Sequence, residues 1–498
     1  MSTILLRCLN AVWLLVAASL VSGQTLKDPA LRVTEVVGGL NAPTTMAFIG
    51  PSDILVLQKN DGLVQHVIDG VPQPVPVLDV PVDSASERGL LGIAIHPAFP
   101  MTPLVYLYYT ESSSGVDTIG APPPLANRIY RFTWNGSALI DPTLILDLPV
   151  TTGPNHDGGV IGFGPDGKLY AVIGDLNRRG QLQNISTGPA ADDTSVIIRL
   201  NDDGTIPQDN PFFAQGGNLP KYYAYGIRNS FGLAFDPVTA KLWMTENGPS
   251  TYDEINFVEP GFNSGWVQLM GPAARNPQGL ETLVQFPGSH YREPAFSWFE
   301  TVAPTAIVFL NSPQLGTAYQ NHIFVGDSKN GNLYHFTPNT SRDGFIFEDP
   351  ALADLVADAD DELQEVILGS GFGGITDLKV GPDGRLYVLS IAQGKIYAIA
   401  SAPATWQGSV TDGTTGVALA GVSVRARLLG AEPAVRVNTS TDASGAYTLS
   451  DLIPGRYRVR FSRSGYRLQR RQVKLSADEP VTLDVQLPPR RSVVVCHG

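Results

Sequence analysis

The sequence predicts an all-β protein, with a six-bladed β-propeller followed by a small Ig-like β-sandwich. Three observations lead to this prediction. The 498 residues include 51 Gly and 39 Pro, and these punctuate short β-branched runs. A strand–turn–strand unit recurs six times, and the pattern changes near residue 400. A chain of this length also exceeds what one core usually supports, so two domains are expected.

The propeller is predicted from the repeat, which covers residues 26–400. Its turns GPDGKLY, from Gly164, and GPDGRLY, from Gly381, are nearly identical. One such unit cannot cover its own faces, whereas radial stacking buries them and leaves only short edges. Loops from the inner strands should then meet at one mouth of a central channel. The six copies begin near Met46, Ile93, Ile161, Leu233, Ala306 and Leu378.

The sandwich is predicted for residues 407–489, after a linker at 401–406 and before a tail at 490–498. The runs Gly408-Ser-Val, Ala420-Gly-Val and Leu452-Ile-Pro-Gly-Arg-Tyr resemble those of the carboxypeptidase regulatory-like domain. This segment also carries a basic cluster that could contact an acidic partner, a cell surface or a glycan. The alternative is a solvated strand edge protected by charge. The cluster comprises Arg463, Arg467, Arg470, Arg471 and Lys474.

Residues 1–23 are predicted to be a secretory signal peptide, because one basic residue precedes a short apolar run that ends in small residues. The mature protein would then be secreted or periplasmic. A membrane anchor is the alternative interpretation. The net charge of −13 argues against nucleic acid as a partner, since nucleic acids select basic surfaces.

Three motifs in the propeller carry candidate chemistry. His156 lies in Asn-His-Asp-Gly-Gly, in a loop where it could take a proton from a hydroxyl group. Arg228 and Asn229 supply donors for an anion. The next hairpin supplies backbone carbonyls and acids, which are the ligands that a hard cation such as Ca²⁺ prefers. These are Gly248, Pro249, Asp253 and Glu254.

The segment from Tyr222 to Trp266, with IRNSFGLAFD, resembles the soluble quinoprotein glucose and sorbosone dehydrogenase family. Two further matches are the GLLG-apolar-HP run from Gly89 and the His156 loop directly before GPDGKLY. The resemblance implies a pyrroloquinoline quinone (PQQ) cofactor, a bound Ca²⁺ ion and a sugar substrate. A hydride would pass from a sugar hydroxyl carbon to the quinone, and an unidentified acceptor would remove the electrons.

The resemblance also assigns roles to residues. His156 would be the catalytic base, and Arg228 would stabilise the negative oxygen. The carbonyls of Gly248 and Pro249 would hold the Ca²⁺ that binds the quinone. Asp253 and Glu254 are the candidate acidic ligands, with Glu254 serving a second, structural calcium. The predicted cofactor contacts are Glu87, Arg228, Asn229 and Lys329.

One departure from the family leaves alternatives open. Gly374 and Thr376 stand where two arginines usually clamp the carboxylates of the cofactor. A non-catalytic propeller similar to hedgehog-interacting protein, which recognises glycans or proteins, is the first alternative function. A calcium-dependent lactonase is the second. Glu87 could instead pair with Arg88, Arg228 with an acid of the next blade, and the Gly248 loop could simply be solvated.

Overall fold

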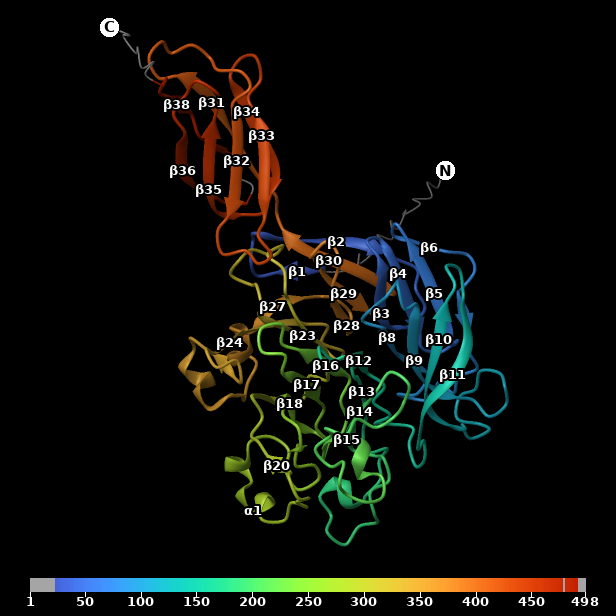
Figure 1. The fold of residues 1–498 in the computed structure, drawn as a ribbon. Helices are drawn as coiled ribbons and strands as arrows, with labels where there is room; N and C mark the ends of the chain where they lie inside the picture. The colour runs from blue at the N-terminus through green and yellow to red at the C-terminus, as the bar shows by residue number, and fades with distance from the viewer. Residues whose placement is uncertain (1–22, 478–479, 491–498) are drawn as a thin grey trace, which may run out of the picture.

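The computed structural model describes residues 23–477 and 480–490. The predicted signal peptide, except for Gly23, and the tail beyond Arg490 lie outside the described residues. Six β-sheets between Thr25 and Ser401 surround a central channel, and two further sheets form a C-terminal sandwich (Figure 1). The predicted propeller and sandwich are confirmed.

The first two propeller sheets consist of consecutive antiparallel strands. The first contains β3 (Pro43–Gly50), β4 (Asp53–Gln58), β5 (Leu63–Ile68) and β6 (Val71–Pro72), with β7 (Leu78–Asp79) on β5. The second contains β8 (Leu90–Ile95), β9 (Leu104–Glu111), β10 (Ala126–Trp134) and β11 (Leu139–Leu148).

The third and fourth sheets add short outer strands that come from long loops. The third contains β12 (Ile161–Phe163), β13 (Leu169–Ile173), β14 (Val196–Leu200), β15 (Tyr222–Tyr225), β19 (Phe262–Asn263) and β20 (His290–Tyr291). The fourth contains β16 (Gly232–Phe235), β17 (Leu242–Glu246), β18 (Thr251–Val258), β21 (Phe296–Glu300) and β26 (Val356–Ala357). The one-turn helix α1 (Pro277–Leu280) lies between β19 and β20 in sequence.

Strands from the N-terminal end complete the last two sheets. The fifth contains β22 (Pro304–Phe309), β23 (Ile323–Asp327), β24 (Leu333–Pro338), β27 (Ile367–Ser370), β1 (Thr25–Leu26) and, on β24, β25 (Phe345–Ile346). The sixth contains β28 (Ile375–Val380), β29 (Leu386–Ser390), β30 (Lys395–Ser401) and β2 (Leu31–Val37). Because β2 pairs antiparallel with β30, the two ends of the ring are joined by backbone hydrogen bonds.

The first strand of each sheet lies nearest the channel, and each contains the start of one predicted repeat. β3 contacts β8 and β28, β8 contacts β12, and β22 contacts β16 and β28. Six apolar clusters fill the space between neighbouring sheets, and each takes side chains from two of them. Burial of these apolar faces between neighbouring blades stabilises the fold, as the repeat predicted. The two GPDG turns also have the same hydrogen bonds, for example Gly164 N to Lys168 O (2.9 Å) and Gly381 N to Arg385 O (3.0 Å).

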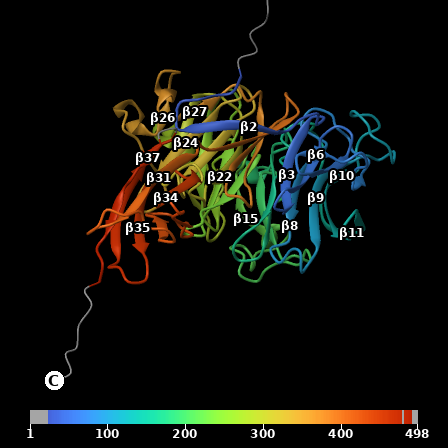
Figure 2. The same cartoon turned by 90° about the horizontal axis from the view of Figure 1, so that it is seen from above.

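The sandwich packs two four-stranded sheets around its own core, in which Trp406 is fully buried. One sheet contains β34 (Ala446–Leu452), β31 (Ala404–Asp412), β37 (Val481–Thr482) and β38 (Val485–Leu487). The other contains β33 (Arg436–Ser440), β32 (Ser423–Leu428), β35 (Gly455–Ser462) and β36 (Gln469–Leu475). Figure 2 shows the sandwich to one side of the propeller, and β31 follows β30 after two residues.

Candidate active site

A cavity of about 450 Å³ lies in the channel, among the loops that adjoin the inner strands. It takes lining residues from all six propeller sheets or their loops. Six of the residues predicted from the sequence line it, although they are far apart in the chain. These are Glu87, His156, Arg228, Asn229, Gly248 and Asp253.

His156 is held in place by a carboxylate that the sequence analysis did not predict. Its Nδ1 shares a hydrogen bond with Asp175, which follows β13. Asp175 also accepts hydrogen bonds from Asn177 N (2.9 Å) and from the indole Nε1 of Trp266 (2.8 Å). Because Nδ1 is engaged, Nε2 is the ring nitrogen left to receive a proton from a ligand in the cavity. Such a base with an orienting carboxylate is a recurrent arrangement in catalysis.

The backbone around His156 is tightly constrained. His156 has φ of +65°, which is uncommon for a residue other than glycine, and the residue is 7% exposed. A Cβ atom on Gly174 would come within 2.5 Å of Arg228 O and 2.6 Å of His156 O, so only glycine fits there. This close approach brings the His156 and Arg228 loops together beside the end of β13.

Glu87 joins these loops instead of pairing with Arg88. Its Oε2 accepts hydrogen bonds from the backbone N–H of His156 (2.5 Å) and from Asn229 Nδ2 (3.0 Å). The carboxylate therefore ties together the loop before β8, the His156 loop and the Arg228 loop. The alternative pairing of Glu87 with Arg88 is not observed.

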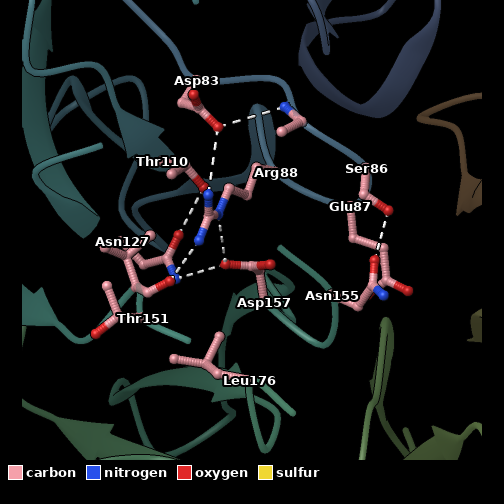
Figure 3. A network of polar contacts seen from close by, with 12 residues as sticks. Asp83, Ser86, Glu87, Arg88, Thr110, Asn127, Thr151, Asn155, Asp157 and Leu176 are labelled. Atoms are coloured by element: carbon pink, nitrogen blue, oxygen red, sulfur yellow. Dashed lines mark hydrogen bonds and ion pairs between the residues drawn. The ribbon is translucent and has the colours of Figure 1, made fainter. Parts of the chain in front are cut away.

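Arg88 turns away into a buried polar network (Figure 3). It is 5% exposed, donates to Val150 O (2.6 Å), and lies 3.6 Å from Asp83 and 3.7 Å from Asp157. Asp157 accepts a further hydrogen bond from Asn127 (2.9 Å). Burial raises the pKa of Asp157 to about 6, although Asn127 and Arg88 oppose the shift. Arg88 directly follows Glu87 in the sequence, and Asp157 directly follows His156. The buried network therefore helps to hold the backbone at Glu87 and His156, which line the cavity.

Arg228 lies between β15 and β16 and has donor groups to spare. Its Nη1 donates to Asn247 O (2.8 Å), and its guanidinium carbon lies 5.3 Å from the ring centre of Trp266. Among the described residues, no carboxylate lies within 4.0 Å of its guanidinium, so the alternative pairing with an acid of the next blade is not observed. Burial lowers its pKa. Its Nε, Asn229 Oδ1 and Asn247 Oδ1 are buried without hydrogen-bond partners.

The candidate metal ligands divide into two groups. Gly248 and Asp253 line the cavity, but both oxygens of Asp253 are engaged by backbone N–H groups. Oδ1 accepts from Gly248 (2.8 Å), and Oδ2 accepts from Val302 (2.6 Å) and Ala303 (2.7 Å). Asp253 therefore shapes the loop that carries Gly248. Pro249 is not among the lining residues.

Glu254 lies outside the cavity, 2% exposed, and accepts hydrogen bonds from Gly271 N (2.6 Å) and Asn256 (2.8 Å). Burial and the neighbouring Glu246 raise its pKa. Within residues 23–477 and 480–490, no three His, Cys, Asp or Glu side chains form a group that could hold a metal. A calcium site built from carbonyl oxygens stays a prediction.

Lys329 does not line the main cavity. It is exposed, donates to Thr301 O (2.7 Å), and borders a second hollow that shares Thr301 with the first. The cations that line the main cavity besides Arg228 are Lys59 and Lys379, and the sequence analysis predicted neither. At the positions of the missing arginines, Thr376 lines the cavity, whereas Gly374 does not.

Comparison with known proteins agrees with the resemblance seen in the motifs. The family model described as glucose/sorbosone dehydrogenase matches residues 40–398, and the carboxypeptidase regulatory-like model matches residues 405–488. The aldose sugar dehydrogenase of Escherichia coli K12 is 27% identical over 362 residues, which are 70% of this chain and 87% of that protein. Quinoprotein glucose dehydrogenase B of Acinetobacter calcoaceticus is 32% identical over 256 residues, which are 47% of this chain and 52% of that one.

Two further comparisons bear on fold and on function. A solved structure of a Thermus thermophilus protein, described as a putative oxidoreductase (glucose dehydrogenase), has a TM-score of 0.59 and 28% identity. The match covers 74% of this chain and 99% of that one. Mouse hedgehog-interacting protein is 28% identical over 233 residues, which are 42% of this chain and 32% of that protein.

Proposed function

Since the chain belongs to the glucose/sorbosone dehydrogenase family, we propose that it is an exported sugar dehydrogenase that depends on PQQ and calcium. The names of the E. coli and Acinetobacter relatives support a sugar substrate and a quinone cofactor. The observation that carries the proposal is the cavity that brings the His156–Asp175 pair beside Arg228. Export rests on the predicted signal peptide.

The cavity lining fits the quinone. PQQ carries three carboxylates, and the cations that would face them are Lys59, Arg228 and Lys379, of which Lys379 also pairs with Asp377 (2.8 Å). The buried Nε of Arg228 and the unpaired Oδ1 atoms of Asn229 and Asn247 leave polar groups for a bound ligand to satisfy. The carbonyl oxygens of Gly248 and Pro249 would hold Ca²⁺. When bound, the quinone accepts the hydride and Ca²⁺ polarises its carbonyl.

The residues of the chain would act on the sugar. Nε2 of His156 takes the proton of the sugar hydroxyl, while Asp175 stabilises the imidazolium that forms. The Arg228 guanidinium lines the same cavity and would stabilise the negative oxygen. Glu87 fixes the backbone of His156 and the amide of Asn229, so that base and donors keep their spacing.

Dye-linked oxidation of an aldose tests the proposal. Protein reconstituted with PQQ and Ca²⁺ should reduce the dye only when sugar is present, and His156→Ala should abolish this activity. His96→Ala is the matched control, because His96 lies outside the cavity, 3.6 Å from Asp202. Absence of sugar-dependent reduction in the parent protein, or full activity in His156→Ala, would refute the proposal.

A non-catalytic binding protein is the second candidate, and the missing arginine pair favours it. Gly374 and Thr376 stand in place of the two arginines, so two bidentate charge pairs with the cofactor are absent. The hydroxyl of Thr376 already donates a hydrogen bond to Pro43 O (2.9 Å). At about 1.5–3 kcal/mol per charged hydrogen bond, the loss amounts to several kcal/mol of cofactor affinity. Titrating PQQ into the calcium-loaded protein separates the two candidates. No change in PQQ absorbance up to about 100 μM would favour the binding protein.

A further inference from the structure

One face of the C-terminal sandwich is covered by arginine side chains. In β32 and β35, alternate residues point into the core, and the residues between them are exposed. The exposed residues are Arg425 and Arg427 on β32, and Arg456, Arg458 and Arg460 on β35. We call these five residues, together with Arg470 on β36, the arginine face.

The pairing register places these arginines opposite one another. Arg425 faces Arg460, and Arg427 faces Arg458, across the β32–β35 ladder. Arg460 in turn faces Arg470 on β36. The four strands β33, β32, β35 and β36 contain no Asp or Glu, and none of the ion pairs found among the described residues involves the arginine face. Like charges directly opposite one another destabilise a sheet, so the isolated domain carries uncompensated repulsion.

Protection of a strand edge does not account for this pattern. In the sheet order β33-β32-β35-β36, the strands β32 and β35 are central, and edge protection needs charges only on β33 and β36. Solubility does not account for it either. The strands of the opposite sheet contain no Lys or Arg, and apart from Asp451 their exposed residues are neutral, such as Gln407, Thr448 and Gln486. The positive charge is therefore concentrated on one face of a chain whose net charge is −13.

We propose that the arginine face binds an acidic polysaccharide through its carboxylates. Strands lie about 4.8 Å apart and alternate residues about 7 Å apart, so the guanidinium groups form a grid that suits repeating anionic groups. Guanidinium binds carboxylate through two parallel hydrogen bonds. All six arginines of the grid are exposed to solvent.

The composition of the face favours a polysaccharide over two other polyanions. Proteins that lie on membranes insert Trp, Phe or Leu into the lipid, and single-stranded nucleic acids stack on aromatic rings. The large hydrophobic residue exposed on the described part of the sandwich is Val417, which lies in the loop between β31 and β32. The arginine face itself offers guanidinium groups, with Lys474, Ser, Asn and Gln beside them.

Binding of polygalacturonate to the full mature chain tests the proposal, without PQQ, calcium or a sugar substrate. We expect saturable binding near physiological salt that weakens as salt rises, and no binding of neutral dextran. Arg458→Gln with Arg460→Gln should raise Kd at least tenfold and leave Tm unchanged or higher, because repulsion with β32 and β36 is relieved. The matched control is Lys241→Gln with Lys395→Gln, which removes two charges from the propeller and should leave Kd unchanged.

Several outcomes would contradict the proposal. Failure of the parent chain to bind polygalacturonate, or equal binding by the Arg458/Arg460 variant, would overturn it. Tighter binding of phosphatidylglycerol vesicles or of duplex DNA would overturn the assignment to a polysaccharide. Should the first variant lower Tm, Arg425→Gln with Arg427→Gln removes the facing charges from β32 and repeats the test. Because the measurement needs no turnover, its failure leaves the proposed dehydrogenase activity untouched.

Discussion

At the residue scale, the position and orientation of His156 depend on neighbours from distant parts of the chain. Asp175 is 19 residues away, and Trp266 is a further 91 residues beyond Asp175. Trp266 therefore fixes the carboxylate that fixes the imidazole, while Glu87 fixes the backbone of the same histidine. The geometry of one side chain thus depends on three loops.

Asp175→Asn tests this dependence. The amide keeps the shape but can hold the imidazole in the wrong tautomer and cannot stabilise imidazolium, so we expect kcat of the reconstituted enzyme to fall by about 10²–10⁴-fold. KM for the sugar should change little. Steady-state kinetics of the parent and the variant provide the measurement. Unchanged kcat would show that Asp175 does not position the base.

The raised pKa of Asp157 predicts how the free energy of unfolding depends on pH. Its pKa is raised from 3.8 to about 6 in the folded protein, so the folded state holds a proton more tightly than the unfolded state. Protonation therefore stabilises the fold below about pH 4, and this contribution is lost as pH rises to about 6. Asp157→Asn should flatten the slope of unfolding free energy between these values. Urea unfolding at several pH values measures it, and an unaltered slope would contradict the account.

At the scale of elements, the strand β2 closes the propeller. Leu31 is 3% exposed and lies in the cluster between the fifth and sixth sheets, whereas Glu35 on the same strand faces solvent and pairs with Lys395 (2.8 Å). Substitutions at these two residues therefore allow the contribution of packing to be compared with that of surface charge on the same strand. The closure depends on packing and on the β2–β30 ladder, since an exposed ion pair contributes little.

Leu31→Ala should lower the free energy of unfolding by about 2–5 kcal/mol, because it leaves a cavity in the core. Glu35→Ala should cost less than about 1 kcal/mol. Denaturant titrations followed by tryptophan fluorescence compare the two variants. Equal effects would mean that burial on β2 does not stabilise the ring.

Some strands of the propeller can be predicted from the sequence, and others cannot. The six inner strands could be placed because each combines an apolar run with a Pro, Asp or Gly turn. The two-residue strands β19, β20 and β26 could not, because their pairing is set by tertiary contacts and not by local pattern. Asp175 was missed for a related reason, since its partner lies in another loop. The available signal was a repeated Gly-Asp step, which directly follows β13 at Asp175 and ends β23 at Asp327.

At the scale of the whole molecule, ring closure creates the site. His156, Arg228 and Glu87 were predicted from motifs, but only the radial arrangement brings them to one cavity of about 450 Å³. The same arrangement places Lys329, in the loop between β23 and β24, on a neighbouring hollow, and leaves Glu254 of β18 buried outside the cavity. Roles assigned by resemblance to these two residues stay predictions.

The most direct test of the central claim is a single turnover of the PQQ- and calcium-loaded protein with an aldose, in the absence of any electron acceptor. Absorbance of the bound cofactor reports its reduction without knowledge of the natural acceptor. The account predicts reduction that is slowed when C1 of the sugar carries deuterium, and that His156→Ala slows by about 10²-fold or more. A cofactor that binds in this cavity and stays oxidised in the presence of every aldose tested would contradict it.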